Sequence, residues 1–94
     1  MFVLLIHYQV PADEVARVRD AHRAFLGTLY REGRLVCSGP RADGTGGVLV
    51  ARTQPRDELM SLLAHDPFVV QGIGRYEVIE FEAKLQAEGF AGFV

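Results

Sequence analysis

Two side chains with complementary chemistry, His22 and Asp66, are the first candidates for a reactive site in this sequence. His22 lies on the apolar stripe of a predicted helix, between Val18 and Phe25, so its imidazole is expected to face inward. Imidazole titrates near neutral pH, which suits a general acid or base. A carboxylate bound to one ring nitrogen fixes the tautomer and makes the other nitrogen a better base. We therefore predict that Asp66 orients His22 for proton transfer.

Each of the two residues also has a purely structural interpretation. A buried histidine usually satisfies its ring through a backbone carbonyl. Asp66 precedes Pro67, and this pair is typical of the N-cap and first position of a short helix. The cap and the histidine contact are compatible, because a carboxylate has two oxygens with several lone pairs. Both interpretations stay open at this point.

Arg19 and the tripeptide Ser38-Gly39-Pro40 extend the predicted site. Arg19 lies one turn before His22 on the same side of the helix, where it would hold an anionic substrate group or Asp66 itself. A solvated surface arginine is the alternative. The tripeptide ends a predicted strand, where Gly39 permits close backbone approach to a ligand and Ser38 offers a hydrogen bond. A plain turn explains the tripeptide equally well.

His7 and His65 complete the histidine count. His7 lies on a predicted strand and points either into the pocket or toward a second subunit. His65 is expected to be exposed, since adjacent helix positions do not face each other. No close pair of histidines has metal-ligand spacing and there is one cysteine, so we predict no metal site. A set of His7, His22 and Asp66 is the remaining geometric alternative for a metal.

No cofactor is predicted either. Gly44-Thr45-Gly46-Gly47 is rich in glycine, but it lies in a predicted hairpin, opens no helix and contains no lysine. A phosphate-binding loop requires these features. The expected ligand is therefore a small molecule bound without a nucleotide cofactor.

Seven predicted elements must position these side chains. Strands are predicted over Phe2–Tyr8, Arg34–Ser38, Gly47–Arg52 and Arg75–Glu82, and helices over Asp13–Glu32, Pro55–His65 and, as a short turn, Asp66–Gln71. The long helix carries an apolar stripe of Val15, Val18, His22, Phe25 and Leu29, with Leu26 beside it. The order βαββαβ with right-handed crossovers places both main helices on one face of a four-stranded antiparallel sheet. We predict a single α+β domain of ferredoxin-like fold over residues 1–94, in which 83–94 form a C-terminal tail.

The other face of the predicted sheet requires a cover. The apolar run in Phe2–Tyr8 is continuous rather than alternating, which indicates that both of its faces are buried. Helices cover only one face, so we predict a homodimer of the dimeric α/β-barrel type, with two sheets packed together. A domain of this size buries only ~60–65% of its unfolded surface and gains from association. Phe90, Phe93 and Val94 are expected to dock across the seam.

Charge and composition exclude several classes of function. Twelve acidic and ten basic residues give a net charge of −2, which provides no general attraction to nucleic acid or anionic membranes. Cys37 is the single cysteine, so no intrachain disulfide forms and a cytoplasmic location is expected. The apolar run Phe2–Ile6 is too short for a signal peptide or a membrane span.

Three blocks of the sequence resemble the YCII-related (YciI-like) family. The blocks are Arg19-x-x-His22 followed by Phe25-Leu26, then Gly33-Arg34-Leu35 leading to Ser38-Gly39-Pro40, and finally Asp66-Pro67-Phe68 followed by Gly72 and Tyr76. The resemblance extends from Phe2 to about Phe81, and Gln86–Val94 does not match it. It implies a ferredoxin-like fold that dimerises through its sheet. It also implies that His22 and Asp66 correspond to the family's proposed active-site pair. Muconolactone-isomerase-like and dehydrochlorinase-like chemistry has been associated with such folds.

We therefore expect a small cofactor-independent enzyme of lyase or isomerase type. His22 would move a proton on a cyclic or aromatic metabolite, while Arg19 or backbone groups near Ser38 and Gly39 hold the developing negative charge. The main alternative is a non-catalytic dimeric module that binds a small ligand or serves as an accessory domain. Mono-oxygenase-like chemistry without a cofactor is a third interpretation, since dimeric barrels host it.

Overall fold

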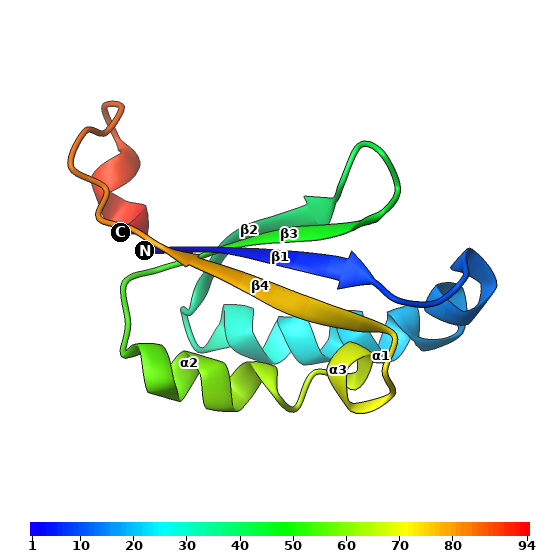
Figure 1. Cartoon of the computed structure of the whole chain (residues 1–94). Helices are drawn as coiled ribbons and strands as arrows, with labels where there is room; N and C mark the ends of the chain where they lie inside the picture. The colour runs from blue at the N-terminus through cyan, green and yellow to red at the C-terminus, as the bar shows by residue number, and fades with distance from the viewer.

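A computed structural model describes all 94 residues. The elements follow the order β1 (Phe2–Tyr8), α1 (Ala12–Arg31), β2 (Leu35–Pro40), β3 (Gly46–Ala51), α2 (Arg56–Leu63), α3 (Pro67–Val70), β4 (Gly74–Glu80) and a 3₁₀ turn, η1 (Phe90–Phe93) (Figure 1). Every predicted strand and helix is present, and each end lies within two residues of the predicted position.

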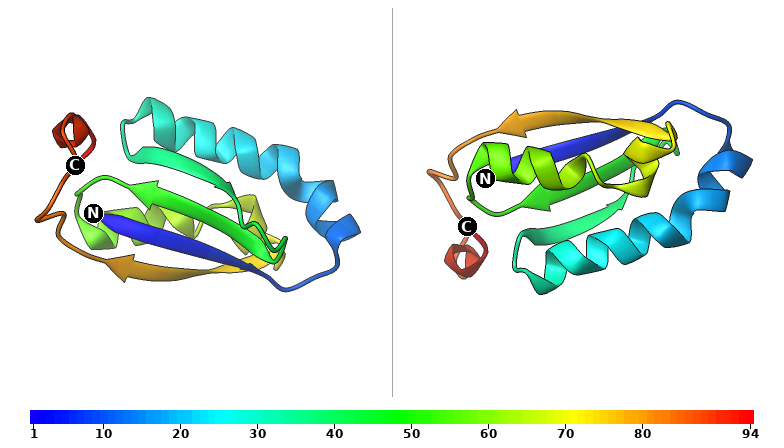
Figure 2. Two further views of the ribbon diagram at one scale, coloured as in Figure 1. Left: turned by 90° about the horizontal axis from the view of Figure 1, so that it is seen from above. Right: turned by 90° about the horizontal axis from the view of Figure 1, so that it is seen from below.

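The four strands form one antiparallel sheet in the order β2-β3-β1-β4, which is the ferredoxin-like arrangement. The helices α1, α2 and α3 lie on one face of the sheet (Figure 1), with α1 toward the β2 side and α2 and α3 toward the β4 side (Figure 2). The predicted α+β architecture is confirmed. The dimeric barrel concerns a second chain and stays a prediction.

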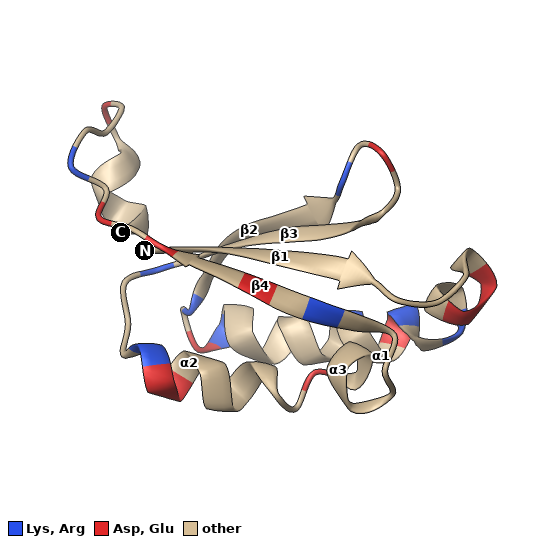
Figure 3. Cartoon of the chain, in the orientation of Figure 1, with Lys and Arg blue, Asp and Glu red and all other residues tan.

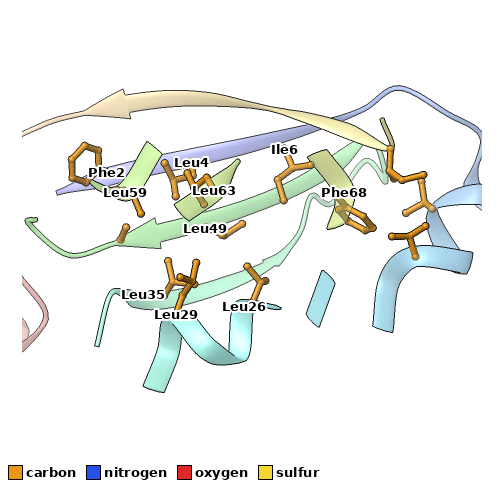
Figure 4. Close-up of a cluster of buried hydrophobic side chains, with 14 residues drawn as sticks. Phe2, Leu4, Ile6, Leu26, Leu29, Leu35, Leu49, Leu59, Leu63 and Phe68 are labelled. Carbon is orange, nitrogen blue, oxygen red and sulfur yellow. The ribbon is translucent and has the colours of Figure 1, made fainter. Parts of the chain in front are cut away.

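The core fills the space between the sheet and the helices (Figure 4). Alternate side chains of β1 point into it, so Phe2, Leu4 and Ile6 are each at most 2% exposed. On α1 the buried stripe contains Leu26, whereas Phe25, which we had predicted there, is only half-buried. The complete cluster consists of Phe2, Leu4, Ile6, Val15, Val18, Leu26, Leu29, Leu35, Leu49, Ala51, Leu59, Leu63, Phe68 and Ile73.

A glycine allows β1 and β3 to approach at the end of the sheet that carries the predicted site. Gly46 pairs with His7, and a Cβ atom at position 46 would collide with the backbone oxygen of Ile6. Any other residue would push the strands apart here. Gly46 therefore allows β3 to lie close against β1 at this end of the sheet.

The C-terminal tail leaves the sheet near the N-terminus (Figure 1). Arg52 holds it there, since Nη1 donates a 2.6 Å hydrogen bond to the backbone oxygen of Gly92 and the guanidinium lies 5.8 Å from the ring centre of Phe93. Phe93 and Val94 keep 45% and 38% of their surface exposed, so their docking on a second subunit stays a prediction. None of the helices combines the length and the apolar character that crossing a bilayer requires.

Candidate active site

The structure brings His22 and Asp66 into direct contact. Nδ1 of His22 lies 2.8 Å from Oδ1 and 2.9 Å from Oδ2 of Asp66. His22 comes from the middle of α1, and Asp66 from the junction of α2 and α3. Because an ionised carboxylate only accepts hydrogen bonds, Nδ1 carries the hydrogen and donates it. Nε2 then holds the free lone pair of the neutral ring.

Asp66 is completely buried, and three donors satisfy its carboxylate. Besides His22, the backbone N–H of Phe68 donates to Oδ1 at 2.9 Å and the hydroxyl of Tyr76 donates to Oδ2 at 2.6 Å. The first of these bonds is the N-cap of α3, so the structural and the pairing interpretation of Asp66 hold together. A buried carboxylate needs such a complete set of donors, since an unpaired one would be strongly destabilising.

Tyr76 is a member of this network that the site prediction missed. It lies on β4 opposite Ile6, with its side chain on the helix-covered face. Burial raises the pKa of the Tyr76 hydroxyl above its ordinary value, and the charge of Asp66 and the hydrogen bond to it raise the pKa further. A buried tyrosine hydroxyl seeks a partner. The sequence could therefore have indicated that the Tyr76 hydroxyl needs a hydrogen-bond partner. The register of β4 on β1 decides that this partner is Asp66.

Phe68 fixes the plane of the imidazole. Its ring stacks on His22 with 3.9 Å between ring centroids and 6° between the planes. The ring of Tyr8 packs T-shaped against the ring of Phe68, with 6.0 Å between the ring centroids. Asp66 prevents rotation within the plane and Phe68 prevents tilting out of it. The two contacts therefore preorganise His22.

His22 forms part of the wall of an open cavity of about 460 Å³, within the usual range for small-molecule sites. Polar or backbone lining comes from Arg19, His22, Arg23, Ser38, Gly39 and Pro40. Apolar side chains come from Ile6, Tyr8, Leu26, Leu49 and Phe68, and Gly47 contributes backbone. Nε2 of His22 makes no hydrogen bond within the chain and is not fully buried, so it is accessible from the cavity.

Arg19 and Ser38-Gly39-Pro40, which the sequence placed in the site, line the same cavity as His22. Arg19 makes no hydrogen bond to Asp66, so the predicted alternative in which these two residues pair is wrong. The Ser38 hydroxyl lies 2.7 Å from the hydroxyl of Tyr30, which orients it. Tyr30 was not among the predicted site residues.

The structure does not bring His7 to the cavity. Ile6 and Tyr8 face the helices, and strand alternation therefore turns His7 to the opposite face. There its Nε2 lies 2.8 Å from Glu77 Oε1. The predicted metal alternative of His7, His22 and Asp66 is wrong, because β1 separates the two histidines. No three potential metal-ligand side chains cluster anywhere in the chain.

The cavity has further lining residues that the sequence-based prediction did not include, among them Arg23 and Gly47. Arg23 follows His22 directly on α1, and its long side chain reaches the cavity. Gly47, predicted as the first residue of a strand, lies within β3 and lines the cavity. The missing side chain at Gly47 leaves part of the cavity open.

Comparisons with known proteins agree with this fold. The model of the YCII-related domain matches residues 1–82, and the predicted tail 83–94 lies beyond the match. Among solved structures, 5-chloro-2-hydroxyhydroquinone dehydrochlorinase from Burkholderia phenoliruptrix AC1100, in complex with 2,5-dihydroxybenzoquinone, is similar to this chain. The two are 23% identical, with a TM-score of 0.69, over 87% of this chain and 94% of the dehydrochlorinase. This likeness shows a shared fold. A search of curated proteins returned no match.

Proposed function

The chain belongs to the YCII-related family, and we propose that it is a small enzyme of lyase or isomerase type that transfers a proton on a cyclic or aromatic metabolite. One observation carries the proposal: His22 has Nδ1 bound to a buried carboxylate and Nε2 accessible from a cavity. This arrangement is that of a positioned general base. The similar structure of a dehydrochlorinase bound to a quinone supports a cyclic substrate and elimination chemistry.

The proposed mechanism assigns each group one step. Nε2 of His22 removes a proton from the substrate, and Asp66 stabilises the imidazolium that forms. In an elimination, the released electron pair forms a carbon–carbon double bond while the leaving group departs with its bonding pair. In an isomerisation, the imidazolium returns the same proton to a different carbon. Arg19 and the hydroxyl of Ser38 lie on the cavity wall where they stabilise negative charge on a substrate oxygen.

The proposal is tested with His22→Ala on cyclic candidates, beginning with chlorinated hydroxyhydroquinones and measuring release of chloride. Loss of a placed base lowers turnover by ~10²–10⁴-fold. His65→Ala is the matched control, since His65 is exposed and lies outside the cavity. If His22→Ala and wild type turn over such a substrate equally, the proton-transfer role is excluded. The pair then belongs to a non-catalytic binding module.

We also propose that the protein is a homodimer formed through the open sheet face. Side chains on this face are apolar at its centre: Val3 pairs with Val50, and Leu5 pairs with Val48. β1 carries no Lys, Arg, Asp or Glu (Figure 3). Ile79 is 45% exposed on the neighbouring β4. A second copy would bury these side chains, which explains the continuous apolar run of β1.

A further inference from the structure

We propose that the cavity selects a cyclic carboxylate and that Arg19 and Arg23 bind its carboxylate group together. This inference rests on the proposed function for the identity of the site, and it adds the chemical class of the substrate. It assigns Arg23 a role in binding the substrate, together with Arg19.

The two arginines lie on one face of α1. They are four positions apart, so their Cβ atoms are separated by about one helical turn, ~5–6 Å. Both line the cavity that His22 opens into. Two planar guanidinium groups at this spacing match the two oxygens of a carboxylate, which arginine binds through parallel hydrogen bonds.

Neither arginine has a partner in the protein. Elsewhere in the chain Arg34 pairs with Glu32 and Glu58, Arg41 with Asp43, and Arg56 with Glu80. Arg19 and Arg23 form no ion pair and no side-chain hydrogen bond, although Asp20 lies between them in the sequence. Their donors are therefore free for a ligand.

No carboxylate lines the cavity beside the two arginines. Its lining residues include neither aspartate nor glutamate. Asp66 lies behind His22, with no exposed surface and with both oxygens occupied. The cavity thus carries two positive charges in a protein of net charge −2. A concave site lined by one sign of charge concentrates ligands of the other sign.

Benzoate and its neutral isostere benzamide are the probes that test this inference. Their binding to the full chain is followed by NMR of the arginine Nε–Hε groups and of the backbone amides, at constant ionic strength. Benzoate is expected to shift the signals of Arg19, Arg23 and Ser38 and to bind at least tenfold more tightly than benzamide. Arg19→Gln and Arg23→Gln are each expected to weaken benzoate binding by about tenfold or more, the loss of a charge-assisted hydrogen bond. Arg31→Gln is the control, because Arg31 lies on the same helix, makes no ion pair and does not line the cavity.

Equal binding of benzoate and benzamide would overturn the inference. Unchanged benzoate binding in a variant that carries both Arg19→Gln and Arg23→Gln would overturn it too, as would the absence of any response to benzoate. His22→Ala separates this failure from failure of the proposed function. If His22→Ala binds benzoate normally and also turns over substrate like wild type, the carboxylate site stands and the base does not. If the arginine variants bind benzoate normally while His22→Ala abolishes turnover, the base stands and the carboxylate site does not.

Discussion

Nδ1 of His22 binds both carboxylate oxygens of Asp66, at 2.8 and 2.9 Å, across a separation of 44 residues in the sequence. The contact depends on α1 and the α2–α3 junction lying on the same face of the sheet. A single N-cap position thereby serves the fold and the site, since Asp66 starts α3 and orients the imidazole. Because α3 also supplies Phe68, one short segment sets both the tautomer and the plane of His22.

Replacing Tyr76 by phenylalanine should destabilise the protein. The variant removes one of three donors to a buried carboxylate and leaves Oδ2 of Asp66 with the His22 contact alone. A lost hydrogen bond to a buried charged group lowers the free energy of unfolding by about 1–3 kcal/mol. Urea denaturation measures the change. Tyr30→Phe is the control, because its hydroxyl is bonded at an exposed position, and its effect should stay below about 0.5 kcal/mol. Equal effects of the two variants would contradict the network.

The raised pKa of Tyr76 should make the free energy of unfolding fall at alkaline pH. Its pKa in the folded protein is raised above the ordinary value of 10.0 by burial and by Asp66, so the folded state keeps a proton that the unfolded state releases. The stabilisation is complete below pH 10 and is lost as the pH rises above it. The expected slope is about 1.4 kcal/mol per pH unit. Unfolding free energies of wild type and Tyr76→Phe on both sides of pH 10 test this. The difference between them should shrink as pH rises, and a constant difference would count against the raised pKa.

Gly47→Ala should reduce the cavity without disrupting the sheet. The added methyl would lie 3.4 Å from the backbone oxygen of Gly39 and 3.6 Å from Cδ1 of Ile6, which is close to ordinary contact. One methyl group in a binding pocket changes affinity by about 1–3 kcal/mol. Benzoate binding should therefore weaken while the thermal transition changes little. Gly92→Ala is the control, since a Cβ there meets nothing within 4 Å and Gly92 lies outside the cavity. Wild-type affinity in Gly47→Ala would place the ligand elsewhere.

Leu5→Lys should convert the proposed dimer to a monomer. Leu5 lies at the centre of the open sheet face, between Val48 on β3 and Glu77 on β4, and points away from the core. A lysine there places a charge in the interface but leaves the monomer core intact. Sedimentation velocity of wild type and variant at equal concentrations measures the change. Ala24→Lys, on the exposed side of α1, is the control. A monomeric wild-type protein would refute the proposed dimer directly.

Much of the fold follows from local patterns. The period of the buried stripe places His22 on the inner face of α1, and Asp66 before Pro67 predicts the start of α3. Both features depend on residues close in the sequence. The rule that both crossovers are right-handed then places His22 and Asp66 on the same face of the sheet, where they can meet.

The residues that the sequence did not indicate depend on tertiary geometry. Tyr76 reaches Asp66 because of the register of β4 on β1, which a single strand pattern does not specify. Arg23 reaches the cavity through the length of its side chain, although it lies about 100° around the helix from His22. Gly47 lines the cavity from β3, and the predicted strand Gly47–Arg52 by itself did not indicate that a cavity opens there.

The proposed role of His22 as a base depends on which of its two ring nitrogens carries the hydrogen. We would record ¹⁵N NMR of the neutral ring in wild type and in Asp66→Asn. We expect wild-type His22 to carry its hydrogen on Nδ1, with an unprotonated Nε2 accessible from the cavity, and we expect this preference to be lost in Asp66→Asn. A wild-type ring protonated on Nε2 would contradict the proposed role, since the nitrogen at the cavity would then have no lone pair to accept a proton.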